Sequence, residues 1–298
     1  MKSKKTITNK NLLTALLMSA NLIGALTPIA VLATPTGYAH LGETALSQAL
    51  YNLDSMVFSR AYAAEYGNEE VNYLGNDDTQ TITTNGSATT VEGGSQNTKD
   101  GGTGTVKTMN SGVQGADSGS TVTIITMNGG TQYAGAGGTG TINTMNSGAQ
   151  SVSSGMGIIN TMESGQQTLT DTSIGTVVTM NGGTQYVGTG STGTINTMKN
   201  GLQIMFAGAG GIGIINTMDN GEQRIDDDGT GTIETMNGGK QSINGFDSTG
   251  TVKTMNGGDQ NIKAGNTGII DTMNGGRQVI KSGGIGTVKN LNGGWQNI

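Results

Sequence analysis

The sequence contains no cysteine, a single histidine, His40, and only two prolines, Pro28 and Pro35. Without cysteine the chain has no disulfides, thiolate metal sites or cysteine nucleophile. Because proline is absent after residue 35, every later backbone amide can donate a hydrogen bond. Charged residues make up only 12% and aromatic residues 4%, which argues against a disordered chain and against an aromatic-rich globular core. These absences favour a continuously hydrogen-bonded β-sheet.

Glycine is abundant, with 53 residues, but it has neither the strict third-position spacing nor the proline of collagen. The formal net charge is -6. The only charged residues in the first 33 are four lysines, so the rest of the chain carries 11 basic and 21 acidic side chains. We therefore expect no nucleic-acid partner and no anionic membrane surface.

The N-terminus has the pattern of a secretory signal. Four lysines precede an apolar run over residues 12–33. Small-x-small cleavage sites end at Ala33 and at Ala63, so the predicted signal spans residues 1–33, or extends to 63 if the second site is used. A retained membrane anchor is the alternative interpretation of the apolar run.

Residues 34–85 are interpreted as the remainder of the leader or as an N-terminal cap. Within them, apolar residues between 46 and 57 recur at helical spacing, and Thr44 stands where an N-cap would be expected. The sequence does not choose between these two roles.

The rest of the chain is a tandem repeat of about 18 residues. Its anchor is a Thr-Met pair whose methionine recurs at Met109, Met127, Met145, Met162, Met180, Met198, Met218, Met236, Met255 and Met273, with Leu291 in the last copy. A β-branched residue stands three positions before each anchor and a glycine three positions after it. A glutamine stands five positions after each anchor, at Gln114, Gln132, Gln150, Gln167, Gln185, Gln203, Gln223, Gln241, Gln260, Gln278 and Gln296.

Each copy has the pattern of a strand, a turn, a second strand and a glycine-rich loop. A degenerate twelfth copy begins upstream with Val91, Gly94 and Gln96, so the array spans residues 86–298. One copy has too few apolar groups to fold alone, and stacking in parallel at about 4.8 Å per copy solves this. The sequence predicts an all-β solenoid of about 12 rungs.

The repeated positions have structural roles in this prediction. Methionines and β-branched residues form the interior, which requires a bend at the Thr-Met step because period-2 alternation would place them on opposite faces. The glutamine amides are expected to stack up the axis, and a sugar-binding groove is the alternative. Asparagines that follow the anchor, such as Asn110 and Asn128, are interpreted as turn residues.

No catalytic constellation is apparent in the repeat array, and we expect no enzyme activity and no cofactor. The array lacks the histidine and cysteine that nucleophilic triads and most transition-metal sites need. The acidic run 226–228 is interpreted as a solvated loop, with a calcium site as the alternative. The glycine-rich segment 208–211 does not open a helix, so it is not a phosphate-binding loop.

Units of the form Gly-Thr-Val/Ile-x-Thr-Met-Asn-x-Gly-x-Gln-x-Val/Ile resemble the short AIDA-type repeats of self-associating autotransporter adhesins of Gram-negative bacteria. The resemblance covers residues 86–298. It implies a right-handed parallel β-helix passenger at the cell surface that functions in adhesion, autoaggregation and biofilm formation. It also implies an outer-membrane barrel that residues 1–298 do not contain, so we expect the chain to be a fragment of a longer passenger.

The resemblance also suggests partners and a modification. The partners would be identical rods, an unidentified glycan or protein receptor, and a glycosyltransferase that acts before export. Several members of the family carry heptose on serines of the short loop between two strands. By position this loop contains serine only at Ser111, Ser147 and Ser164, while Ser153, Ser154 and Ser282 lie in the other loop as weaker candidates.

Two rival functions come from other classes. A polysaccharide lyase is one, although the rungs are regular and no localised charged cleft is evident. An ice-binding solenoid is the other, because such proteins display flat threonine arrays. Threonine precedes the β-branched position in most copies, but the residue two positions later, taken as its neighbour on the same face, varies through Lys107, Asn143, Val178, Glu234 and Asp271. A uniform Thr-x-Thr surface is therefore not expected.

Overall fold

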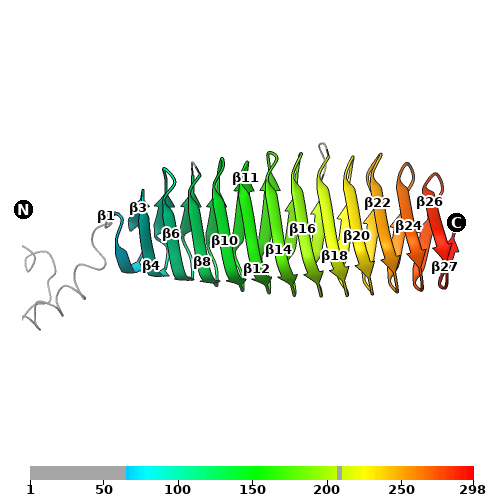
Figure 1. The fold of residues 1–298 in the computed structure, drawn as a ribbon, viewed down its shortest axis with the longest axis horizontal. Helices are drawn as coiled ribbons and strands as arrows, with labels where there is room; N and C mark the ends of the chain where they lie inside the picture. The colour runs from blue at the N-terminus through cyan, green and yellow to red at the C-terminus, as the bar shows by residue number, and fades with distance from the viewer. Residues whose placement is uncertain (1–64, 118, 207–209) are drawn as a thin grey trace, which may run out of the picture. The chain divides into compact units, whose positions relative to one another are not determined.

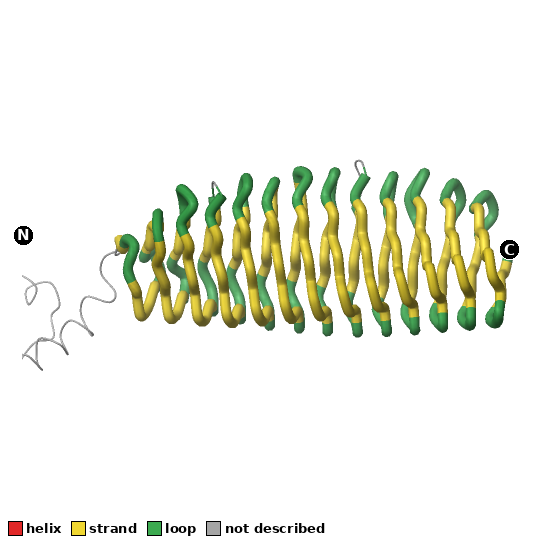
Figure 2. Tube along the Cα trace, viewed as in Figure 1, coloured by secondary structure: helices red, strands yellow, loops and turns green. Residues whose placement is uncertain are grey.

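The computed structural model describes residues 65–298, except 118 and 207–209. The described chain is all β and forms a parallel β-solenoid, as predicted, in which two sheets run side by side (Figures 1 and 2). The described residues form one compact unit. The predicted signal sequence and the helical pattern between residues 46 and 57 lie outside the described residues.

Each turn of the coil contributes one strand to each sheet. The sheet of shorter strands has 14 of them, β1 Glu65–Tyr66, β3 Thr79–Ile82, β5 Ser95–Thr98, β7 Val113–Ala116, β9 Thr131–Ala134, β11 Ala149–Ser153, β13 Gln166–Thr170, β15 Thr184–Val187, β17 Leu202–Met205, β19 Glu222–Ile225, β21 Lys240–Ile243, β23 Asp259–Ile262, β25 Arg277–Ile280 and β27 Trp295–Asn297. The sheet of longer strands has 13, β2 Glu70–Leu74, β4 Asn85–Val91, β6 Thr103–Met109, β8 Thr121–Met127, β10 Thr139–Met145, β12 Met156–Met162, β14 Ile174–Met180, β16 Thr192–Met198, β18 Ile212–Met218, β20 Thr230–Met236, β22 Thr249–Met255, β24 Thr267–Met273 and β26 Ile285–Leu291. We call these the short-strand sheet and the long-strand sheet.

The register places each residue beside its equivalent one turn away. In the long-strand sheet Met180 pairs with Met198, and in the short-strand sheet Gln185 pairs with Gln203. The extra residues between Met198 and Met218 fall between β17 and β18, and the pairing of β16 with β18 is unbroken. Insertions therefore enter the loops, and both sheets keep a constant register.

The coil begins about one turn before residue 86, the start expected from the sequence. β2 pairs with β4, and β3 pairs with β5. In this first turn Val71 and Leu74 occupy the β-branched and methionine positions, and Gln80 is in register with Gln96. The turn lacks a Thr-Met pair, which is the signature on which the sequence assignment depended. Part of the segment interpreted as a leader or cap is thus solenoid.

Each long strand bends at one residue. The prediction placed this bend at the Thr-Met step, but it lies one residue earlier. The pairing of β6 with β8 joins Val106 to Ile124 and Thr108 to Thr126, but skips Lys107, and every pair in this sheet skips the equivalent position. We call it the corner position. Because the corner precedes the Thr-Met step rather than coinciding with it, normal alternation resumes after it. Val106 and Met109 therefore both point inward.

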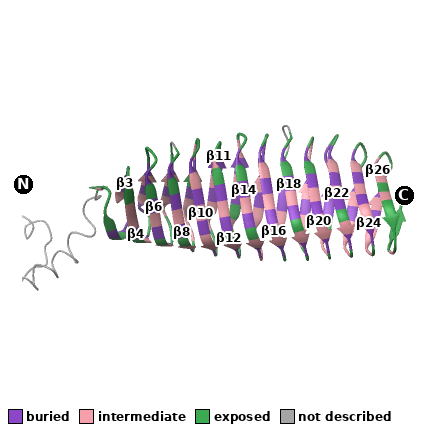
Figure 3. Cartoon of the chain, viewed as in Figure 1, coloured by how far each residue is buried: buried purple, intermediate pink, exposed green. Residues whose placement is uncertain are grey.

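The interior has two apolar clusters. The larger combines the methionines with their β-branched partners on the long-strand sheet, and the ten anchor methionines are fully buried. The smaller is formed by the residue two positions after each glutamine, from Ala134 to Ile280. Figure 3 shows the resulting bands of buried residues running along the stacked strands. The long-strand sheet thus contributes two apolar positions per turn and the short-strand sheet one, and both clusters run along the axis.

The glycine three positions after each anchor is required by the backbone. Gly148 has a φ of 97°, a conformation that side-chain-bearing residues rarely adopt. A Cβ atom there would also lie 2.7 Å from the carbonyl oxygen of Gly130, the equivalent residue one turn away. Both the positive φ and the close approach of the neighbouring turn therefore require glycine at this position.

A second glycine sets the distance between the two sheets. The second residue of each long strand from β6 onward points inward, and at Gly175 an added Cβ would overlap the Leu169 side chain of the short-strand sheet. One turn has Val122 in place of this glycine, and there the facing residue is the smaller Ala116, with both residues fully buried. Volume is exchanged between the sheets within a single turn.

We predict that Gly175→Val and Leu169→Ala compensate each other. The first should cost about 1–3 kcal/mol through overpacking and the second about 2–5 kcal/mol through cavity formation. The double variant should be at least about 1 kcal/mol more stable than the sum of the two costs, because the valine fills the space that the leucine leaves. Urea unfolding of the four proteins in a double-mutant cycle measures this coupling.

The matched control pairs Gly175→Val with Ile270→Val, a core change in a distant turn. Those two effects should add, because the sites share no partner. Additive costs in both cycles would contradict the proposed exchange of volume.

Candidate interaction surfaces

A buried column of glutamine side chains follows the axis of the coil. Each Nε2 atom donates to the Oε1 atom of the glutamine one turn earlier, at distances between 2.5 and 2.9 Å. The column begins at Gln80, one turn before the first glutamine noted in the sequence. From Gln80 to Gln278 its members are 0% exposed. The amides are therefore internal, and no groove exposes them to a sugar.

The second amide proton connects the two sheets. Gln132 Nε2 donates to the carbonyl oxygen of Thr141, at 3.1 Å, and Gln150 Nε2 donates to that of Gly140, at 3.0 Å. Both carbonyls belong to the long-strand sheet, whereas the glutamines belong to the short-strand sheet. The amides from Gln80 to Gln296 other than Gln185 thus have partners both along the axis and across the core, which satisfies a buried polar group.

A second ladder of amides lies on the surface at the turns. Asn128 Nδ2 donates to Asn110 Oδ1, and Asn146 Nδ2 to Asn128 Oδ1, at 2.9 and 2.8 Å. Where a carboxylate replaces asparagine, as at Glu163, it accepts from the next asparagine, Asn181. These side chains are exposed, so water can replace each lost partner.

We predict unequal effects from breaking the two ladders in the same turn. Gln185→Leu removes the donor to Gln167 Oε1 and one acceptor of Gln203 Nε2, which keeps its bond to the Gly193 carbonyl oxygen. Because these polar groups are buried, the free energy of unfolding should fall by about 2–5 kcal/mol. Asn181→Ala breaks the exposed ladder and should cost less than about 1 kcal/mol. Urea unfolding followed by circular dichroism measures both, and equal losses would show that the buried column has no special role.

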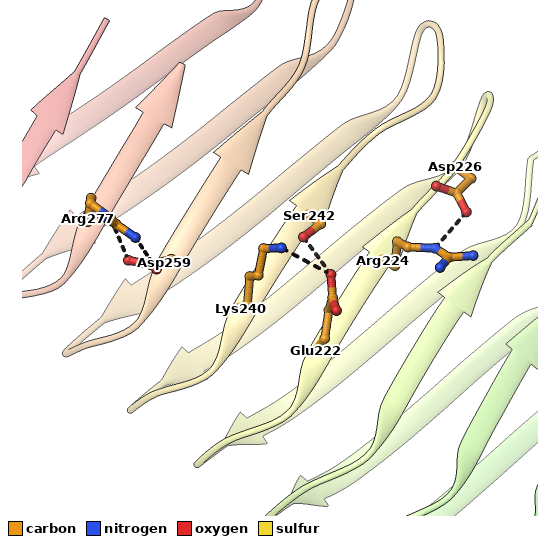
Figure 4. A network of polar contacts seen from close by, with 7 residues as sticks. All are labelled: Glu222, Arg224, Asp226, Lys240, Ser242, Asp259 and Arg277. Carbon is orange, nitrogen blue, oxygen red and sulfur yellow. Dashed lines mark hydrogen bonds and ion pairs between the residues drawn. The ribbon is translucent and has the colours of Figure 1, made fainter. Parts of the chain in front are cut away.

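The position just before the glutamine points outward, and in four consecutive turns it holds charged side chains of alternating sign. We call Glu222, Lys240, Asp259 and Arg277 the charged column (Figure 4). Lys240 Nζ lies 3.6 Å from Glu222 Oε1, and Arg277 forms a two-point contact with Asp259. The hydrogen bond and the charge of Asp259 raise the pKa of Arg277. The column is half-exposed, so its charges remain available to another molecule.

Sequence reasoning did not single out the charged column. The signal that identifies it is the alternation of sign at the 18-residue spacing, which is visible only when the position before each glutamine is compared between copies. The corner position shows the same alternation, with Lys253 2.7 Å from Glu234 and Lys289 2.7 Å from Asp271. Exposed pairs of this kind contribute little to stability.

The candidate glycosylation serines are all exposed. Ser111, Ser147 and Ser164 follow the long strands at the turns into the short strands. In the opposite loops, Ser153 Oγ donates to Asp171 Oδ2 and Ser154 Oγ donates to the carbonyl oxygen of Asp171. The first three are therefore accessible, and their modification stays a prediction.

The acidic run is partly neutralised by a neighbour. Asp226 accepts a hydrogen bond from Arg224 Nε at 2.8 Å, while Asp227 and Asp228 adopt positive φ in the loop (Figure 4). Within residues 65–298, leaving out 118 and 207–209, no group of three or more histidine, cysteine, aspartate or glutamate side chains is arranged to hold a metal ion. The same part of the chain has no helix of the length and apolarity needed to cross a membrane.

The outward faces of the long strands also differ from expectation. The threonine before the β-branched residue, such as Thr105, does not share a flat face with the corner residue Lys107, because the strand turns there. Its neighbour on the same face is Thr103, two residues earlier. Thr-x-Thr pairs therefore lie before the corner in several strands, whereas the expectation of no uniform Thr-x-Thr surface compared each threonine with the residue after it.

Comparison with known proteins returned nothing: no protein-family model, no curated protein and no solved structure matches this chain.

Proposed function

We propose that the solenoid is the stalk or adhesive passenger of a bacterial surface adhesin, which joins cells by contacts between identical rods and promotes autoaggregation and biofilm formation. The fold supports this proposal because it repeats one set of outward positions turn after turn. Weak contacts at such positions add through multivalency.

The charged column is the observation that carries the proposal. Two copies related by a two-fold axis perpendicular to their rods run antiparallel, so the column of one meets the same column of the other in reverse order. Glu222 then faces Arg277 of the second copy, and Lys240 faces Asp259. All four facing pairs have opposite sign. An alternating column is thus complementary to itself in this arrangement.

We predict that charge reversal changes which rods associate. In the reversed variant, Glu222→Lys, Lys240→Glu, Asp259→Lys and Arg277→Glu are combined. It remains complementary to itself but places like charges opposite each other when it meets the original column. Cells displaying the original rod, in its full-length context, should settle together. Mixed populations should segregate, because four favourable pairs of about 0.2–1 kcal/mol each become repulsive.

Two-colour settling assays at low salt measure this segregation, and added salt should weaken it because the charges are exposed. A matched control reverses only the pair at the corner position, through Glu234→Lys and Lys253→Glu, and mixed cells should then still settle together. Free mixing of the reversed and original rods would contradict an antiparallel contact through the charged column. No settling by either rod would contradict self-association altogether.

A further inference from the structure

The outer face of the long-strand sheet carries an unusually restricted set of side chains. Each long strand presents two outward residues before its corner, on either side of the buried middle residue. From β6 to β26 every one of them is threonine, isoleucine or methionine, namely Thr103 and Thr105, Thr121 and Thr123, Thr139 and Thr141, Met156 and Ile158, Ile174 and Thr176, Thr192 and Thr194, Ile212 and Ile214, Thr230 and Thr232, Thr249 and Thr251, Thr267 and Ile269, and Ile285 and Thr287. We call these residues the threonine face.

The fold alone does not require this restriction. Other outward columns of the same rod accept charge readily, including the charged column and the corner position. The position after the glutamine holds residues as different as Tyr133 and Arg224. Strand propensity favours threonine and isoleucine everywhere on a sheet, yet this face lacks lysine, arginine, aspartate and glutamate from β6 to β26, as does the column of residues just before the anchor methionines, from Thr108 to Asn290. The face therefore offers a partner no charged side chain.

The face is also regular in two directions. Thr121 pairs with Thr103 and Thr139, and the register continues without a shift through β26. Figure 1 shows these strands stacked in nearly the same direction along the solenoid. Beneath this face, the glutamine column of the facing sheet donates to carbonyl oxygens of the long strands. The result is a two-dimensional grid of short, stiff side chains.

The spacing of this grid suits ordered water. Equivalent hydroxyl groups in adjacent turns are about 4.8 Å apart, the separation of paired strands. In tetrahedrally bonded water, with oxygens about 2.8 Å from each hydrogen-bonded neighbour, two oxygens that share a neighbour are about 4.6 Å apart. Threonine hydroxyls can therefore bond to water on a nearly matching lattice, while threonine methyl groups and isoleucine side chains favour water that bonds to itself.

We propose that the threonine face binds the surface of ice. A crystal face of water is uncharged, flat and periodic, and it offers hydrogen-bonding oxygens at the spacing of the turns. Because this face lies away from the charged column, ice binding and contact between rods use different residues. A rod attached to cells would then hold them to an ice surface.

The test compares lysine substitutions on the two sheets of the full chain. Thr141→Lys with Thr194→Lys places long, charged side chains on the threonine face. The matched control, Ser151→Lys with Thr184→Lys, places them outward on the short-strand sheet, in columns where Arg224 and Lys240 already stand. Circular dichroism and thermal unfolding should show all three proteins folded. Nanolitre osmometry measures thermal hysteresis and the shape of ice crystals.

The original chain should facet ice crystals and open a hysteresis gap. The variant on the threonine face should lose most of that gap, and the control should keep it within about twofold. Ice that grows as unshaped discs in the presence of the original chain would overturn the proposal, and so would an equal loss in both variants. Retention of the chain by crystalline cellulose or chitin without any effect on ice would assign the face to a neutral polysaccharide instead, and would also overturn it.

Discussion

Everything in this solenoid depends on stacking equivalent residues in parallel register, one turn above the next. The backbone forms two continuous ladders in this way, and the same repetition solves the problem of buried polar side chains. A glutamine amide carries both a donor and an acceptor, so a column of identical amides satisfies itself. The remaining amide proton bonds across the core to the opposite sheet. One residue type thus bonds both along the axis of the coil and between its two sheets.

The inside and the outside of the coil obey different constraints. Inward positions are nearly invariant because each side chain contacts its own copy above and below, and volume can be exchanged only within a turn, as between Val122 and Ala116. Outward positions need only suit a strand, so each column can take its own chemistry. The charged column, the exposed asparagine ladder and the threonine face are therefore distinct surfaces on one scaffold. The two proposed interactions use opposite kinds of surface, one charged and self-complementary, the other neutral and regular in register.

Much of the interior could be predicted from the repeat alone. The sequence predicts that the anchor methionine, the β-branched residue and the glutamine face inward or stack, and the structure buries them in every copy with a methionine anchor. The first turn was missed because Leu74 replaces methionine and no Thr-Met pair is present. Gln80, followed two residues later by Ile82 and in register with Gln96, was the available signal. The predicted bend lies at the Thr-Met step, one residue after the observed corner. The inward set of residues shows that the strand must bend, but not at which residue it does so.

The sequence by itself determined the period, the inward set and the exclusion of proline and cysteine chemistry, because these follow from repetition and from the hydrogen-bonding capacity of each residue. Only the tertiary structure decided which outward residues share a face. A corner at Lys107 and its equivalents separates residues that are neighbours in sequence, and it joins Thr103 to Thr105 on one plane. Stacking then brings residues 18 or 19 apart side by side, so that the sign pattern of Glu222, Lys240, Asp259 and Arg277 becomes a single column. Surfaces of this kind exist only once the turns have stacked on one another.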